Sequence, residues 1–165
     1  MPGIVSDTTP LNYLVLIGAI DVLPRLYQRV LIPPAVKAEL SVPEAPALVS
    51  AWIATAPSWL EILACSKIMD PDLARLDPGE REAIFLATEQ GMSLLLMDER
   101  DGSAAARARG LTVIGTLSAL DAAAARGWLD LPEMFKRLSE TSFRSPGRLM
   151  ASMLAEHARR SKKQE

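Results

Sequence analysis

Two aspartates stand directly after short apolar runs that have the composition of β-strands. Asp7 follows residues 3–6, and Asp98 follows residues 93–97. In open parallel sheets, ligands gather beyond the carboxyl ends of the strands. If these two strands are neighbours, the carboxylates of Asp7 and Asp98 converge, and their repulsion raises one pKa or requires a cation. Taken singly, either aspartate could instead end a turn or cap the following helix.

A hard divalent cation resolves the repulsion between converging carboxylates, because Mg²⁺ and Mn²⁺ prefer oxygen ligands. We therefore predict a Mg²⁺ or Mn²⁺ site with Asp7 and Asp98 as direct ligands, and the residues fit one ion or two. Glu39 and Glu82, on predicted helices between the strands, would bind through water or orient the nucleophile. Such an ion polarises a phosphate oxygen and activates a water, which is the chemistry of phosphodiester hydrolysis.

Further acids lie close to these in the sequence, and their helix positions decide which of them face the site. Glu80 and Glu82 point in different directions, because residues two apart do not share a helix face. We interpret Glu80 as the capping-box partner of Asp77, which leaves Glu82 for the site. Asp101, one turn into the next predicted helix, can reach the same region, whereas we expect Glu99 to point away.

Short apolar runs alternate with helical stretches along the chain, which is the pattern of an α/β domain with a mostly parallel sheet. We interpret residues 1–165 as a single domain. Strands are predicted at residues 3–6, 30–32, 59–63, 93–97 and 111–114, the third at an edge of the sheet. Helices are predicted at residues 10–16, 19–28, 34–40 and 45–55, from Asp77 to Gly91, after Asp98 as far as Gly110, and over about 131–160. Thr9 is the expected N-cap of the first helix, and the end of the chain from Arg159 is expected to be a short, solvated basic tail.

Composition restricts the class of protein. With 165 residues, 49% hydrophobic and 23% charged, the chain is long enough for one globular core and is not disordered in composition. The formal net charge of −2 gives no support to nucleic-acid binding, although an ion held by carboxylates would invert the local field. A lone cysteine, Cys65, and the lack of a basic region or a long apolar stretch near the N-terminus favour a cytoplasmic protein without membrane contact.

Several other chemistries are disfavoured by the residues present. With a single histidine, His157, and a single cysteine, the sequence disfavours both a zinc site and a Cys–His nucleophile pair. The glycines match neither the Walker nor the dinucleotide-binding pattern. An apolar stripe near the C-terminus fits either core packing or a contact with a partner protein or a second copy. Its members are Met134, Phe135, Leu138, Leu149, Met150, Met153 and Leu154.

Five segments, in this order and spacing, resemble the PIN-domain superfamily, and most closely a branch of uncharacterised prokaryotic VapC-like proteins. The resemblance covers roughly the first 130 residues. The segments are residues 6–14, the stretch around Glu39, residues 78–87, residues 95–100 and residues 110–117.

The resemblance implies a three-layer α/β/α sandwich with a central, mostly parallel sheet and an acidic pocket for Mg²⁺ or Mn²⁺. By motif, Asp7, Glu39, Glu82 and Asp98 match the family's acids, and Thr9 matches a hydroxyl residue that supports the first aspartate. Many relatives carry an aspartate in place of Glu82. Related proteins cleave RNA, and many are toxins neutralised by an antitoxin protein, so RNA, a possible antitoxin and a second copy of the chain are the expected partners.

The function that fits these observations is a divalent-metal-dependent endoribonuclease, the toxin of a toxin–antitoxin pair. The alternative is a catalytically inactive PIN-like scaffold that binds RNA or a protein partner. A signalling domain with an acidic phosphoacceptor pocket ranks below both, because residues 113–116 offer no lysine to contact a phosphoryl group.

Overall fold

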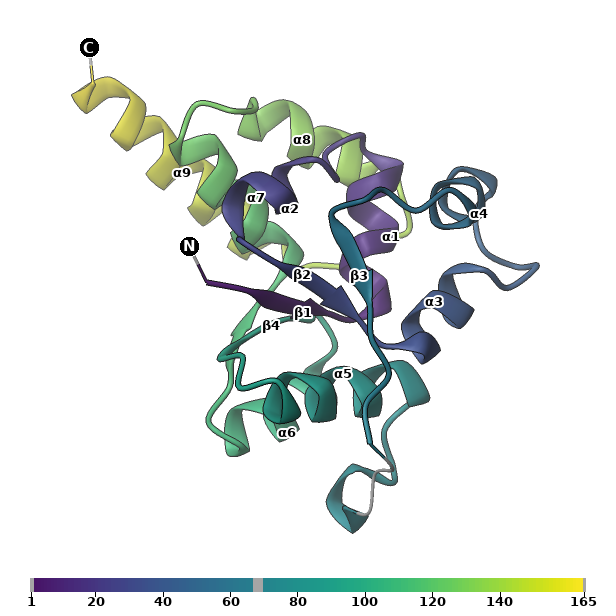
Figure 1. Ribbon diagram of the computed structural model, residues 1–165. Helices are drawn as coiled ribbons and strands as arrows, with labels where there is room; N and C mark the ends of the chain where they lie inside the picture. The colour runs from purple at the N-terminus through teal and green to yellow at the C-terminus, as the bar shows by residue number, and fades with distance from the viewer. Residues whose placement is uncertain (1, 67–69, 165) are drawn as a thin grey trace.

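Five short parallel strands form the centre of the molecule (Figure 1). The computed structural model describes residues 2–66 and 70–164. The strands lie in the order β3-β2-β1-β4-β5, so β1 is central and β3 is an edge strand, as predicted. Each strand supplies only three residues. Their bounds are β1 (Ile4–Ser6), β2 (Val30–Ile32), β3 (Leu60–Ile62), β4 (Leu94–Leu96) and β5 (Thr112–Ile114).

Side chains alternate between the two faces of the sheet, and each face has its own apolar core. In β1, Ile4 packs into one core and Val5 into the other; in β4, Leu96 and Leu95 divide in the same way. This alternation is the two-residue period of a strand, and burial on both faces explains why the strands read as continuous apolar runs. The predicted three-layer α/β/α fold is therefore confirmed.

Helices cover both faces of the sheet. One core contains side chains of α5 and α6, and the other contains side chains of α1, α2, α7 and α8, with α9 outside α7 and α8 (Figure 1). None of the helices within the described residues is long and apolar enough to span a membrane. The helix bounds are α1 (Thr8–Leu16), α2 (Val22–Leu26), α3 (Pro34–Leu40), α4 (Ala47–Ala54), the 3₁₀ turn η1 (Pro71–Leu73), α5 (Pro78–Glu89), α6 (Arg100–Ala108), α7 (Thr116–Ala125), α8 (Leu131–Ser139) and α9 (Gly147–Lys163).

Three predicted boundaries need correction. The first helix begins at Thr8 and has Asp7 at its N-cap, so Thr9 lies inside the helix. The second helix is shorter than residues 19–28, because the chain leaves α1 through Gly18 at φ +76° and makes a turn before Val22. The basic tail is helical as far as Lys163, as part of α9.

The C-terminal apolar stripe belongs mainly to the core. Met134, Phe135 and Leu138 on α8 are buried, and three of the α9 side chains pack partly against them. Leu149 differs, because 47% of its surface is exposed.

Candidate functional site

Asp7 lies at the carboxyl end of the central strand. Its backbone N–H donates to the carbonyl oxygen of Leu96 at 2.9 Å, which ties the end of β1 to the end of β4. Its side chain is 3% exposed and makes no capping hydrogen bond to α1. The expectation that the strands before Asp7 and Asp98 are neighbours is confirmed by the register that pairs Ser6 with Leu96.

The electrostatics of Asp7 are those of a carboxylate crowded by other acids. Burial raises its pKa to about 7, and the backbone N–H of Thr8 opposes this rise. The charges of Glu39, Asp98 and Asp77 raise it further. Asp7 is therefore the point on which several acids, distant in sequence, converge.

Asp98 is held in place by the start of α7. Its Oδ1 accepts a hydrogen bond from the backbone N–H of Thr116 at 2.8 Å, and its Oδ2 accepts one from the Thr116 hydroxyl at 2.5 Å. Burial raises the pKa of Asp98, and the two bonds from Thr116 lower it. A Cβ at Gly115 would stand 3.1 Å from Oδ1, so a small residue allows the carboxylate to lie this close to the helix.

Glu39 lies at the other side of Asp7, between α1 and α5. Its carboxylate accepts hydrogen bonds from the Thr8 hydroxyl and from the backbone N–H of Gly79. We expected Thr9 to be the supporting hydroxyl. In the described residues, the hydroxyl that contacts a site acid from this helix is that of Thr8, and no hydrogen bond of the Thr9 side chain is seen.

The structure brings Glu80 near enough to Asp7 for their charges to interact, whereas we expected Glu82 at the site and its carboxylate lies at the start of α3. Glu80 is 8% exposed; burial raises its pKa to about 7, and the charges of Asp7, Glu99 and Asp77 add to the rise. The carboxylate of Glu82 accepts a hydrogen bond at 3.3 Å from the backbone N–H of the second residue of α3, so it caps that helix.

An acidic cleft of about 170 Å³ opens beside Glu80. Asp101, which we expected to reach the region of Asp98, lines this cleft. Glu99 lines it as well, although we expected that side chain to point away. The carboxylate of Glu99 caps α6 by accepting a hydrogen bond from the backbone N–H of Gly102 at 2.6 Å. The full lining is Arg75, Leu76, Asp77, Glu80, Glu99 and Asp101.

The arrangement of acids at the carboxyl edge of a parallel sheet agrees with the comparison of the sequence with protein families. A model described as a PIN domain matches residues 3–159, which is nearly the whole chain. The chain belongs to the PIN-domain family. A comparison with curated proteins found no match. PIN domains are generally nucleases, and PIN-domain nucleases generally use divalent metal ions.

The donor set of this PIN domain fits such an ion. Asp7, Glu80 and Asp98 offer only oxygen atoms, which suit Mg²⁺ or Mn²⁺. No ion pair formed within residues 2–66 and 70–164 neutralises any of the three. As placed, no three acidic, histidine or cysteine side chains of the described chain are grouped to hold a metal ion. An ion would therefore require the carboxylates to turn towards one another.

Besides Glu80 and Thr8, two further site residues could not be assigned from the sequence. Asp77 was interpreted only as a helix cap, yet its side chain makes no capping bond, and its charge raises the pKa of both Asp7 and Glu80. Thr116 lies in a segment that carries the family resemblance, but nothing local in the sequence links it to Asp98. That contact depends on the pairing of β4 with β5.

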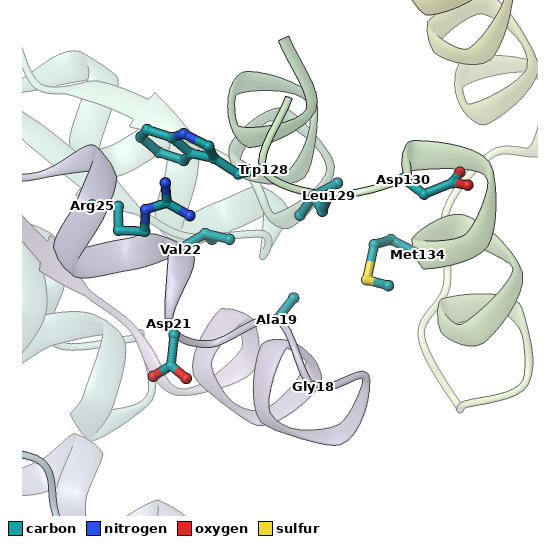
Figure 2. Close-up of a pocket in the computed structure, with 9 residues that line it drawn as sticks. All are labelled: Gly18, Ala19, Asp21, Val22, Arg25, Trp128, Leu129, Asp130 and Met134. Carbon is teal, nitrogen blue, oxygen red and sulfur yellow. The ribbon is translucent and has the colours of Figure 1, made fainter. Parts of the chain in front are cut away.

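A second cavity, of about 340 Å³, lies at the opposite end of the sheet (Figure 2). The loops that form it follow α1 and α7, two helices that return from the carboxyl edge. On one side of the cavity the Arg25 guanidinium lies 4.0 Å from the centre of the Trp128 ring, and Met134 lies across the cavity from them (Figure 2). None of the acids around Asp7 reaches this cavity. Its lining is Gly18, Ala19, Asp21, Val22, Arg25, Trp128, Leu129, Asp130 and Met134.

Proposed function

We propose that this PIN domain is a divalent-metal-dependent endoribonuclease that hydrolyses RNA phosphodiester bonds. The observation that carries the proposal is the crowding around Asp7, a buried carboxylate surrounded by acids from three other parts of the chain. Burying like charges together is costly unless protons or a cation neutralise them. The acids around Asp7 therefore favour a cation, which their carboxylates would hold after turning towards it.

In this proposal Asp7 and Asp98 hold Mg²⁺ or Mn²⁺ directly, and Glu39 contributes through water. Glu80, rather than Glu82, binds the ion through water or orients the nucleophile, because Glu80 is the glutamate whose pKa is raised by the charge of Asp7. Thr116 fixes the direction of the Asp98 carboxylate, and Thr8 does the same for Glu39. These hydroxyls are positioning groups, comparable with the outer partners that orient metal ligands.

When bound, the ion supplies a polarised phosphate oxygen and a water of lowered pKa. The residues of the chain supply the proton transfer. A carboxylate oxygen of Glu80, which lines the open cleft, accepts a proton from the attacking water as that water bonds to phosphorus. The bond from phosphorus to the 3′-oxygen breaks, and the leaving oxygen takes a proton from solvent.

The experiment that tests this activity is cleavage of a panel of mixed RNAs by the purified protein, with Mg²⁺, Mn²⁺ or EDTA. The Asp98→Asn protein is the matched variant, because it keeps the shape of the side chain and removes its charge. We expect cleavage that requires the ion and disappears in the variant. If folded protein free of any partner cuts no RNA with either ion, the nuclease proposal is wrong. The alternative, an inactive scaffold that binds RNA or protein, would then be favoured.

We further propose that the nuclease acts as the toxin of a toxin–antitoxin pair, which rests on the resemblance to VapC-like proteins. Induced expression should then arrest bacterial growth, and expression of the Asp98→Asn protein should not. Equal growth with both proteins, at equal amounts of soluble product, would leave the nuclease without a toxin role.

A further inference from the structure

A second cleft, distinct from the cavity in Figure 2, adjoins the acidic cleft. It has a volume of about 410 Å³ and lies between η1 and α6. Arg75 lines both clefts, so its side chain stands where the two meet. The floor of the second cleft is formed by small side chains of α6 and by Pro71. Its lining is Pro71, Asp72, Arg75, Ala104, Ala105, Ala108 and Arg109.

The turn that carries Arg75 is held firmly. Leu73 and Leu76 on either side of it are buried, and the backbone N–H of Leu76 donates to the carbonyl oxygen of Leu73 at 3.1 Å. From α5, the guanidinium of Arg81 donates to the carbonyl oxygens of Ala74 and Leu76, at 3.4 Å and 2.8 Å. Arg75 is therefore an exposed cation on a preorganised backbone, which lowers the entropy cost of using it to bind a ligand.

Among the described residues that line the two clefts, Arg75 is the cation in position for an anionic ligand. The guanidinium of Arg109 is paired with Asp70. Arg75 forms no ion pair or side-chain hydrogen bond with any residue in the described ranges 2–66 and 70–164. The second cleft has one acid in its lining, Asp72, whereas four acids line the first cleft beside Arg75. They are Asp77, Glu80, Glu99 and Asp101.

We propose that Arg75 binds a phosphate of single-stranded RNA as the strand leaves the acidic site, and that the strand continues along the cleft between η1 and α6. This inference rests on the proposed nuclease function and adds the path of its substrate. A chain with net charge −2 and an acidic site holds a polyanion poorly unless a cation meets the strand beside the site. The small side chains of α6 and the cleft volume of about 410 Å³ leave room for a ribose and a base of a single strand.

The test is single-turnover cleavage of one labelled single-stranded RNA, with Mn²⁺, at several salt concentrations. Four proteins are compared: the wild type, Arg75→Ala, Arg75→Lys and Arg148→Ala. Arg148 is the matched control, an exposed arginine at the start of α9 that lines neither cleft. Two quantities are measured for each protein: the protein concentration at half the maximal cleavage rate, and the cleavage rate at the plateau. Circular dichroism and urea unfolding check the fold.

We expect Arg75→Ala to raise the half-saturating concentration and to leave the plateau rate near that of the wild type. The slope of log affinity against log salt should become shallower by about 0.7, the loss of one phosphate contact on a single strand. Arg75→Lys should retain most of the slope, and Arg148→Ala should match the wild type. RNAs with one methylphosphonate linkage should locate the contact, because neutralising that phosphate should remove the difference between the wild type and Arg75→Ala.

Two results would overturn the inference, and they are distinguishable. If the wild type cleaves RNA and Arg75→Ala keeps the same half-saturating concentration and slope, the path is wrong and the nuclease stands. If the wild type neither binds nor cleaves RNA, the proposed function fails and the inference fails with it.

Discussion

The carboxylate of Glu39 occupies the space where a side chain at Gly79 would lie. A Cβ at Gly79 would stand 2.1 Å from Oε2 of Glu39, and the backbone N–H of Gly79 donates to Oε1 at 3.3 Å. This hydrogen bond runs from α5 to a glutamate of α3. A second one runs from α3 to α5, because the backbone N–H of Ala35 on α3 donates to the carboxylate of Glu82 on α5. Each helix thus uses a glutamate of the other to satisfy a free N–H at its own start, where proline takes the first position.

We predict that Gly79→Ala displaces Glu39 and lowers the free energy of unfolding by about 1–3 kcal/mol. The matched control is Gly147→Ala, at the start of α9, where an added Cβ meets nothing within 4 Å. There the change should be neutral or slightly stabilising, because alanine is the better helix former. Urea unfolding at pH 7 measures both. Equal stability of Gly79→Ala and the wild type would mean that Glu39 has another position of similar energy.

Thr116→Val should weaken the hold on Asp98. The variant keeps the shape of the side chain but loses the hydroxyl that donates to Oδ2, so the pKa of Asp98 should rise further. We expect a loss of stability of about 1–3 kcal/mol and, in RNA cleavage, an acid limb of the pH profile displaced to higher pH. Thr112→Val, at an exposed position of β5, should change neither. An unchanged pH profile in Thr116→Val would remove Thr116 from the site.

The stability of the metal-free protein should fall as the pH rises. The folded-state pKa values of Asp7 and Glu80 are each about 7, above their ordinary values of 3.8 and 4.5, so the folded protein holds these protons more tightly than the unfolded chain. The stabilisation is present below about pH 4 and is lost as the pH rises to about 7. We expect the free energy of unfolding to decrease by about 2–4 kcal/mol between pH 5 and pH 8, in EDTA.

Urea unfolding of the wild type, Asp7→Asn and Glu80→Gln across this pH range measures the effect. Each variant should show a flatter profile, and Mn²⁺ should stabilise the wild type more at pH 8 than at pH 5. A profile that rises from pH 5 to pH 8 would show that these carboxylates are ionised in the folded protein without an ion.

Much of the fold and part of the site could be predicted from the sequence, because they depend on local patterns. Apolar runs that end in an acid located Asp7 and Asp98, and the alternation of strands and helices indicated the layers. We predicted Glu82 for the site, whereas the contacts in the structure lead us to propose Glu80, and the sequence carries a signal for Glu80. Glu80 lies three and four residues before the buried Ala83 and Ile84, so it shares the core face of α5.

Other features of the site depend on tertiary contacts that no local pattern encodes. The bond from Thr116 to Asp98 exists because β5 pairs with β4 and brings the start of α7 beside the end of β4. The position of Glu99 depends on both levels. Its side chain caps α6 through a local bond, and the packing of α6 against α5 places it on the wall of the cleft that Glu80 lines.

The central claim is that Asp7 and Asp98 hold a divalent ion directly and that Glu80 supports it through water, and Mn²⁺ binding tests this claim most directly. Isothermal titration at pH 7.5 would compare the wild type with Asp7→Asn, Asp98→Asn, Glu80→Gln and Glu82→Gln, each checked for folding. We predict that the wild type and Glu82→Gln bind Mn²⁺ alike, and that the other three variants bind at least about tenfold more weakly. Wild-type protein that binds no Mn²⁺, or Glu82→Gln that loses as much affinity as Glu80→Gln, would contradict the account.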